Sequence, residues 1–300
     1  MPQSELRTYV IGRRRRSDRD AVDAFTENGT GGNPAGVVLA DALPDAATMQ
    51  RIAAEAGYSE TVVAAPEGAR WRLRFFSPES EVPFCGHATI ALGAVLAAEN
   101  GEGVYQLSLS EGEIEVEARI KDGVGHATLR SLPTHSAPAS EALLEGALAL
   151  FSYRRDELDP RLPAMRMHAG ADHLFLALTG RAQLSAMRYD LDKGRAFMRR
   201  HGLVTVALVW REAERLFHAR NAFASGGVIE DPATGAVAPA LAGMLRDRGI
   251  LTKGEVTILQ GADMGRPLRI VARVDGAAGG PVLVRGASAE IAAEGAGVAQ

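Results

Sequence analysis

Two stretches of this chain resemble each other, and this repetition constrains the fold more than any other feature. Phe75–Gly101 and Phe223–Gly249 each run from an aromatic residue through a polar loop and a small-residue turn into an Ala-rich segment that stops at glycine. Phe76 and Phe223 lie 147 residues apart, and Gly101 and Gly249 lie 148 residues apart. Because the copies stay in step, we predict a duplicated half-chain whose two lobes face one cleft.

The second copy contains a pattern typical of an anion site. Glu230 and Asp231 precede Pro232 and an apolar segment that ends at Gly249. Proline favours the first position of a helix, and small residues let another group approach the backbone closely. Unpaired N–H groups and the helix dipole favour an anion at such an N-terminus. We therefore predict a helix that starts at the proline and presents its first N–H groups, beside a carboxylate, to a cavity.

Length and composition are those of a globular protein. The 300 residues suffice for one large or two ordinary domains. A net charge of −4 gives no reason to expect nucleic acid or an anionic membrane as a partner. Cys85 is the only cysteine, which excludes a disulfide framework and a Cys-based zinc site. No apolar run reaches membrane-spanning length and no signal-type block follows the early basic residues, so we expect a cytoplasmic protein.

Local patterns predict the remaining elements and a boundary between lobes. Helices are expected over 44–56, 141–149 and 191–201, and strands over 6–11, 61–65, 71–76, 104–109, 113–120, 123–129, 174–178, 204–210, 215–223, 255–260, 268–274 and 282–284. Residues 132–138 carry Pro and Ser and predict a linker. We therefore place the N-terminal lobe at 1–131 and the C-terminal lobe at 132–284, with 285–300 packing back on the first.

Three further patterns suggest other ligands, and we reject each of these interpretations. The glycines of Gly29–Gly36 resemble a dinucleotide fingerprint, but Pro34 and a β-branched run follow where that motif needs a helix. The basic run Arg13–Arg16 is interpreted as a solvated loop rather than a phosphate site. His168 and His173 lie five residues apart across a glycine, so we expect no metal there.

Two polar residues stand out by position. Glu60 lies between a helix stop at Gly57 and an apolar strand, where loops often carry function, although a surface charge would give the same pattern. His87 opens the first of the two paired helices. A second G-H-A-T sequence, at 125–128, has no helix after it, so His126 is predicted to be an ordinary strand residue.

Six motifs follow one another in a recognisable order: D-A-F at Asp23, G-G-N-P-A-G-V-V at Gly31, S-E-T at Ser59, F-C-G-H-A-T at Phe84, E-D-P-A-T-G-A at Glu230 and Q-G-x-x-M-G-R-P at Gln260. In this order the chain, from Val22 to its final strand, resembles the phenazine biosynthesis PhzF-like proteins, which are related in fold to diaminopimelate epimerase. The resemblance implies an α+β fold of two pseudo-symmetric lobes. Each lobe would be a barrel-like, mostly antiparallel sheet around a central helix, with the active site between the lobes.

The resemblance also implies a function and its residues. The family's named member isomerises dihydro-hydroxyanthranilate by moving protons on carbon without a cofactor, and members are typically homodimers. By position, Glu60 matches the family's proton-shuttling glutamate, and His87 and Asp231 match its two supporting polar groups. The positions that would hold the substrate are Asn33, Gly86, Gly235 and Ala236.

The chain departs from the family pattern at two places. Ala236 stands where the phenazine enzyme has a serine, so one hydroxyl donor is missing and the substrate is left open. About ten mostly charged residues, Gly12–Ala21, separate the first strand from the D-x-F motif, which leaves the position of that strand open.

We therefore predict a cofactor-independent isomerase that moves protons on a small carboxylate, without metal. Partial burial would raise the pKa of Glu60 toward neutrality, and two helix N-termini with His87 and Asp231 would hold the developing charge. A two-cysteine racemase is excluded by the single cysteine. Two alternatives stay open: an epimerase that pairs Cys85 with a carboxylate, and a non-catalytic protein that binds a small carboxylate.

Overall fold

The computed structural model describes residues 6–8, 21–25, 32–110 and 112–290. Arg13–Arg16, nearly all of the charged segment after the first strand and the tail from residue 291 lie outside the described residues. The first predicted strand is present as β1 (Leu6–Thr8), which pairs with β3 (Asn33–Ala40). Strand β3 begins within the glycine-bearing second motif, where the dinucleotide fingerprint would need a helix.

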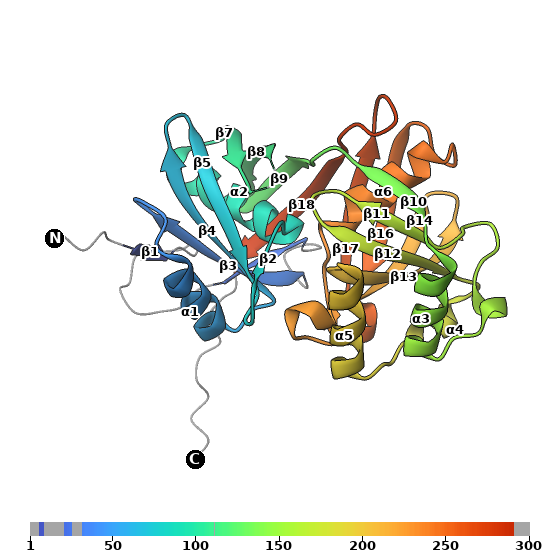
Figure 1. The fold of residues 1–300 in the computed structure, drawn as a ribbon. Coiled ribbons are helices and arrows are strands. Elements are labelled where there is room, and N and C mark those ends of the chain that lie inside the picture. The colour runs from blue at the N-terminus through green and yellow to red at the C-terminus, as the bar shows by residue number, and fades with distance from the viewer. Residues whose placement is uncertain (1–5, 9–20, 26–31, 111, 291–300) are drawn as a thin grey trace, which may run out of the picture.

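The described residues form a mixed α+β structure (Figure 1). Its helices are α1 (Ala46–Ala56), α2 (Gly86–Asn100), α3 (Glu141–Phe151), α4 (Arg181–Ser185), α5 (Leu191–His201) and α6 (Val237–Asp247). Its further strands are β2 (Ala21–Ala24), β4 (Glu60–Glu67), β5 (Arg70–Phe76), β6 (Glu81–Val82), β7 (Gly103–Ser108), β8 (Glu113–Lys121), β9 (Val124–Arg130), β10 (His135–Pro138), β11 (Met165–His168), β12 (Asp172–Leu178), β13 (Thr205–Ala213), β14 (Leu216–Ala222), β15 (Glu230–Asp231), β16 (Gly254–Gln260), β17 (Leu268–Val274) and β18 (Leu283–Glu290).

Local chemistry explains why several helices match their predicted bounds. The Asp45 side chain accepts a hydrogen bond from the Thr48 N–H at the start of α1, and Gly57 ends that helix at φ 72°. Asp190 accepts from Lys193 in the same way, and Gly202 ends α5 at φ 61°. An Asp cap satisfies an N–H that the helix leaves unpaired, and glycine adopts the left-handed terminal conformation without steric cost.

Two predicted boundaries are wrong. Residues 135–138, predicted as part of a linker, form β10 and pair with β11. The last strand is longer than expected, since β18 extends to Glu290. In both segments a partner strand that is distant in sequence supplies the hydrogen bonds, and such pairing can override a local turn signal.

The duplication seen in the sequence extends to the strand pairing. In the N-terminal half (β1–β9 with α1 and α2), β3 is parallel to β4 and β5 is parallel to β7, with α1 and α2 in the respective connections. In the C-terminal half (β10–β17 with α3–α6), β12 is parallel to β13 across α4 and α5, and β14 is parallel to β16 across α6. The remaining neighbours in both halves are antiparallel. The repeated sequence stretches thus occupy equivalent places in a repeated topology.

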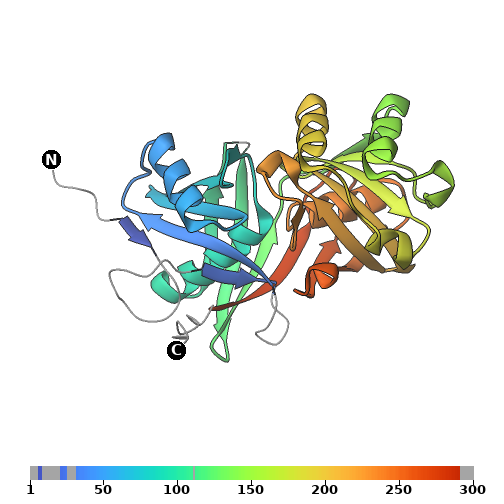
Figure 2. The same ribbon diagram turned by 90° about the horizontal axis from the view of Figure 1, so that it is seen from below.

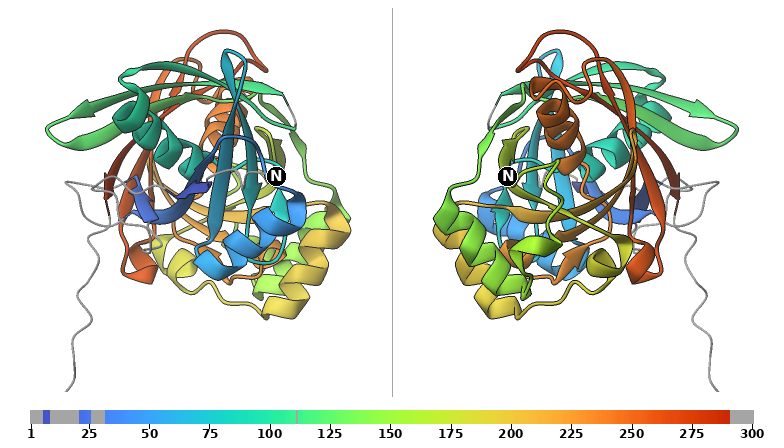
Figure 3. Two further views of the ribbon diagram at one scale, coloured as in Figure 1. Left: turned by 90° about the vertical axis from the view of Figure 1, so that its left-hand side faces the viewer. Right: turned by 90° about the vertical axis from the view of Figure 1, so that its right-hand side faces the viewer.

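The strand β18 joins the two halves. It pairs with β17 of the C-terminal half and with β9 and β2 of the N-terminal half. In Figure 1 it runs between the two groups of elements, and Figure 2 shows the same division from below. Helices α1, α3 and α5 lie along one outer side of the molecule (Figure 3).

Each half places one helix among its strands. Helix α2 is buried from Gly86 to Ala97 and contacts β2, β3, β4, β8, β9 and β18. Helix α6 is buried from Val237 to Arg246 and contacts β10, β11, β12, β17 and β18. A helix with apolar residues all round is typical of a core position. Two expectations from the sequence stay predictions: the strands of each half close into a barrel, and the chain divides between residues 131 and 132.

Candidate functional site

The two repeated turns meet at the N-termini of α2 and α6. A Cβ atom on Gly86 would lie 2.4 Å from the carbonyl carbon of Gly235, and a Cβ on Gly235 would lie 2.5 Å from the His87 nitrogen. Atoms of this kind do not approach so closely, so both positions require glycine. The predicted convergence of the two turns is therefore present, as a direct contact between backbones.

The helix after the second turn starts later than predicted. Helix α6 begins at Val237, with Ala236 as its N-cap residue, and not at Pro232. The Asp231 side chain explains the delay: its Oδ1 accepts from the Ala233 N–H at 3.2 Å, and its Oδ2 accepts from the Thr234 hydroxyl at 2.7 Å. Local side-chain hydrogen bonds of this kind compete with helix formation.

The two neighbouring acids of β15 have different environments, since successive side chains of a strand point to opposite faces. Asp231 belongs to the group of site residues. Glu230 forms an ion pair with Arg220, whose Nε lies 3.0 Å from Oε1, and both side chains are largely buried. Glu230 therefore serves to bind Arg220 within the fold.

Asp231 is held on both sides. Asn33, at the start of β3, donates to its Oδ1 at 2.6 Å and so links the two halves. Gln260 donates to the Asp231 carbonyl at 2.7 Å and to the Thr234 hydroxyl at 3.2 Å. The sequence motifs contained Gln260 and Thr234, but neither was chosen as a site residue. Their only signal in the sequence was the motif, and Gln260 lies 26 residues from Thr234 and 29 from Asp231.

Glu60 occupies the first position of β4 and is 5% exposed. Its Oε2 lies 3.4 Å from Nε2 of His87 and has no hydrogen-bond partner among the described residues. Burial and the negative charge of Asp231 raise the pKa of the Glu60 carboxyl well above its usual value, although a hydrogen bond from Ser59 opposes this. The expected direction of this pKa shift is confirmed, and the interpretation of Glu60 as a surface charge is wrong.

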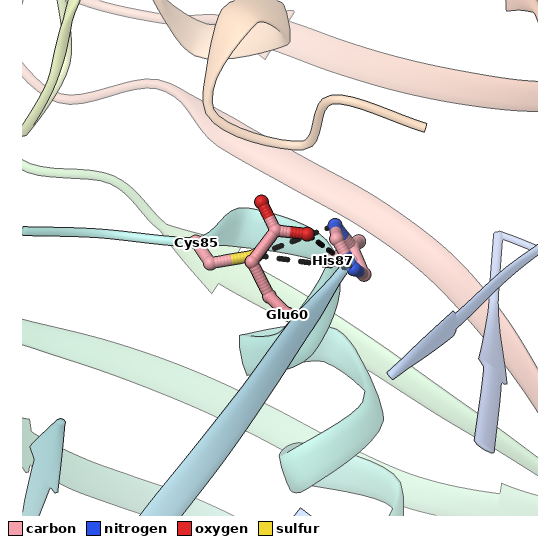
Figure 4. A group of neighbouring side chains, drawn as sticks. All are labelled: Glu60, Cys85 and His87. Carbon is pink, nitrogen blue, oxygen red and sulfur yellow. Dashed lines mark hydrogen bonds and ion pairs between the residues drawn. The ribbon is translucent and has the colours of Figure 1, made fainter. Parts of the chain in front are cut away.

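His87 lies beside Glu60 as the second residue of α2 and is 1% exposed (Figure 4). Burial lowers its pKa, so the ring is neutral near neutral pH. The Asn33 amide nitrogen, a donor, lies 3.5 Å from Nδ1. Burial thus favours the neutral form of both the Glu60 carboxyl and the His87 imidazole.

Cys85 completes the group drawn in Figure 4. Its Sγ lies 3.3 Å from Nδ1 of His87, and its side chain is buried. Burial, with the nearby charge of Glu60, raises the thiol pKa well above its usual value. A thiol held in its protonated form is a poor nucleophile and a poor metal ligand.

Two groups of side chains among the described residues have the composition and spacing of metal ligands. Glu60, Cys85 and His87 offer ligand atoms within 4.8 Å of one another, as do His135, His168 and Asp172. The second group lies on three adjacent strands and is partly exposed. The Arg166 guanidinium already donates a hydrogen bond to the Asp172 carboxylate, with a nitrogen–oxygen distance of 2.7 Å. The predicted turn between His168 and His173 is confirmed, with Gly170 at φ 90°.

The site residues surround a small cavity with a volume of about 10 Å³, enough for about one water molecule. Its lining residues are Glu60, Phe84, Cys85, Gly86, His87, His173, Val204, Thr205, Phe223, Asp231, Thr234, Gly235 and Ala236. All predicted site residues except Asn33 line it, and Asn33 bonds to Asp231. His173 on β12, Thr205 on β13 and Phe223 just after β14 were not chosen as site residues from the sequence. A ring-sized ligand needs more space, so its binding requires the two turns or nearby side chains to move.

A profile of the family described as phenazine biosynthesis-like protein (PhzC-PhzF) matches residues 22–295. The chain belongs to this family. The PhzF match begins after the charged segment that departs from the family pattern, and it includes every residue of the candidate site.

Relatives with assigned names agree with the family match. A trans-2,3-dihydro-3-hydroxyanthranilate isomerase of Pseudomonas fluorescens is 33% identical over 263 residues, which cover 86% of this chain and 90% of the relative. An uncharacterized isomerase of Deinococcus radiodurans is also 33% identical and covers 85% of both chains. With isomerases matching over most of both chains, this member of the PhzF family is an isomerase.

Solved structures support the fold. A phenazine biosynthesis protein of the PhzF family from Bacillus anthracis aligns with a TM-score of 0.75 at 21% identity and covers 91% of this chain and 96% of its own. A hydroxyproline epimerase from Agrobacterium vitis aligns with a TM-score of 0.56 at 12% identity, covering 92% and 89%. The predicted epimerase-like α+β fold is confirmed. Within the described residues, no helix has the length and apolar character needed to span a membrane.

Proposed function

We propose that this protein isomerises a small, carboxylate-bearing cyclic substrate by moving a proton between carbon atoms, with Glu60 as the acid and base. The pseudomonad relatives are named for trans-2,3-dihydro-3-hydroxyanthranilate, which makes that compound the first substrate to test. No oxidant or reductant is needed, because an isomerisation conserves both atoms and electrons.

The environment of Glu60 supports this role. Its raised pKa favours the protonated carboxyl, which is the form that can donate a proton to one substrate carbon. The resulting carboxylate can then remove a proton from another carbon, which restores the acid and completes the shift of the double bond. A general acid–base group placed in this way typically contributes a factor of about 10²–10⁴ to the rate.

His87 and Asp231 are proposed to support the proton transfer. Nε2 of His87 lies 3.4 Å from Oε2 of Glu60, and an N–H at that position would stabilise the carboxylate formed when Glu60 gives up its proton. Asp231, held by Asn33, contributes the negative charge that keeps the Glu60 proton in place. Loss of either group would alter the proton affinity of Glu60.

The substrate carboxylate is proposed to bind where the N-termini of α2 and α6 meet. The Gly86–His87 and Gly235–Ala236 backbones lie together there, and N–H groups at helix N-termini favour an anion. Ala236 supplies a backbone group but no hydroxyl, so the carboxylate would be bound with fewer side-chain donors than in an enzyme with serine at this position.

A one-cysteine epimerase is the second candidate, because Cys85 Sγ lies only 3.3 Å from His87. The raised thiol pKa argues against it, since the thiolate is the reactive form. A non-catalytic carboxylate-binding protein is less well supported. A buried carboxyl oxygen without a hydrogen-bond partner is costly to keep, and carboxylate binding alone does not require it.

The burial of Glu60 beside His87 and Asp231 is the observation that carries the proposal. The test is incubation with candidate carboxylates in deuterated water, with deuterium at carbon measured by mass spectrometry. Wild type should incorporate deuterium, and Glu60→Gln should lose at least about 10²-fold of that rate. The matched control Glu113→Gln changes an exposed strand residue and should have no effect. Undiminished labelling in Glu60→Gln would remove Glu60 from the mechanism.

Three further expectations belong to the proposal. The family resemblance favours a homodimer, the sequence pattern favours a cytoplasmic location, and the repeated topology supports two lobes divided near residue 131. Size-exclusion chromatography with light scattering tests the dimer. A monomer with full activity would contradict that expectation and leave the catalytic proposal unchanged.

A further inference from the structure

The cavity is also lined by a buried histidine for which the proposed mechanism has no use. His173, on β12 of the C-terminal half, is 0% exposed and lines the same cavity as Glu60, His87 and Asp231. Its Nδ1 lies 2.8 Å from the hydroxyl oxygen of Thr205, the residue opposite it on β13. Its Nε2 is buried and has no hydrogen-bond partner among the described residues.

An unpaired buried nitrogen of this kind is costly to maintain. Leaving a polar group buried without a partner costs about 1–3 kcal/mol, and an apolar side chain at this position would avoid that cost. Burial also lowers the pKa of His173 to about 3, so the ring is neutral throughout the physiological pH range. A neutral imidazole presents one donor and one acceptor nitrogen, and its tautomer decides which ligand it can bind.

The partner of Nδ1 determines the tautomer. Within the described part of the chain, Nδ1 of His173 is the only hydrogen-bond partner found for the Thr205 hydroxyl. The hydroxyl hydrogen is therefore best placed on the line to Nδ1, which then accepts. The ring hydrogen consequently lies on Nε2, the nitrogen without a partner. The free position of His173 is a hydrogen-bond donor.

We propose that His173 determines substrate specificity by donating the Nε2 hydrogen to an oxygen of the substrate other than its carboxylate. This inference rests on the proposed function, because it assigns the carboxylate to the helix N-termini and the second oxygen to the C-terminal half. The ligand class is a small cyclic carboxylate that carries a hydroxyl or carbonyl oxygen on the ring. An analogue without that oxygen would leave Nε2 unpaired and bind more weakly.

Two stable aromatic ligands test this assignment: 3-hydroxyanthranilate and anthranilate differ by the one hydroxyl. Calorimetry should show that wild type binds the hydroxylated ligand about tenfold more tightly, the ratio expected for one ordinary hydrogen bond. His173→Phe should bind the two ligands equally. His173→Gln keeps an N–H donor on the side chain and should restore part of the preference.

Nitrogen NMR provides a readout that a merely structural role would not change. The Nε2–H resonance of His173 should shift on addition of 3-hydroxyanthranilate and shift much less with anthranilate. Thr205→Val removes the hydroxyl that fixes the tautomer and should reduce the preference, which provides a second variant if His173→Phe fails to fold. His126→Phe, on β9 outside the site, is the control and should keep the full preference.

The outcomes separate this inference from the proposed function. Equal binding of both ligands by wild type, a preference that persists in His173→Phe, or no binding of either ligand would overturn the assignment of His173. Deuterium labelling that depends on Glu60 would leave the proposed function intact in each of these cases. If labelling persisted in Glu60→Gln while the hydroxyl preference depended on His173, the catalytic proposal would fail and the specificity assignment would stand.

Discussion

Replacing Gly235 with alanine tests whether the contact between the two turns sets the geometry of the site. The new Cβ would lie 2.5 Å from the His87 nitrogen and 2.6 Å from the Gly86 carbonyl carbon, whereas ordinary contacts begin near 3.4 Å. Both opposing atoms belong to the backbone, so a side-chain rotation cannot relieve the clash. The two turns would have to separate by about 1 Å, a misplacement that can cost an enzyme about 10²-fold in rate.

The expected effects of Gly235→Ala are therefore separable. Overpacking of this size costs about 1–3 kcal/mol of unfolding free energy, measured by urea denaturation. The rate of deuterium incorporation should fall by about 10²-fold under conditions where the variant is fully folded. Gly103→Ala is the matched control, because a Cβ there meets nothing within 4 Å. If Gly235→Ala kept both the stability and the labelling rate of wild type, the proposed junction of the helix N-termini would be refuted.

Three further predictions use other parts of the structure. The pKa of Glu60 is raised in the folded state, so its contribution to stability is complete below the unfolded pKa of about 4.5 and is lost as pH rises through the folded pKa. Urea denaturation at several pH values should therefore show that the unfolding free energy of Glu60→Gln depends less on pH than that of wild type. The same pH dependence in both proteins would contradict the pKa shift. Glu230→Ala removes the ion-pair partner of the partly buried Arg220, which retains the more distant Asp263 carboxylate at 4.0 Å, and should cost about 1.5–3 kcal/mol of unfolding free energy, whereas Glu113→Ala removes an exposed ion pair and should cost about 0–1 kcal/mol. Cys85→Ala should keep the deuterium-labelling rate within about tenfold of wild type; a loss beyond about 10²-fold would instead favour thiol chemistry.

Much of the local structure could be predicted from the sequence. The caps that begin and end α1 and α5 involve residues within a few positions of one another, so Asp45 and Gly57 indicate the bounds of α1 without knowledge of the rest of the chain. The repeated stretches predicted the repeated topology because each copy carries the same order of strand, turn and helix. Motif order also identified Glu60, His87 and Asp231 as neighbours in a site, through the resemblance to the PhzF family.

Other features depend on contacts between residues far apart in sequence. Asp231, whose bonds to its own loop delay the start of α6, is itself held by Asn33 from the other half of the chain. The strand β18 extends to Glu290 because β9 and β2 supply partners for it. Such partners are selected by the assembled fold, and no local pattern specifies them.

The sequence by itself determined the elements, their duplication and the types of side chain available for chemistry. Only the tertiary structure decided how those side chains affect one another. It placed Glu60 against His87 and near the charge of Asp231, and it brought His173 to the same cavity from the other half. The physical reason is that proton affinity and unpaired hydrogen-bonding groups depend on burial and on distances of a few ångströms, which exist only once the two halves are in contact.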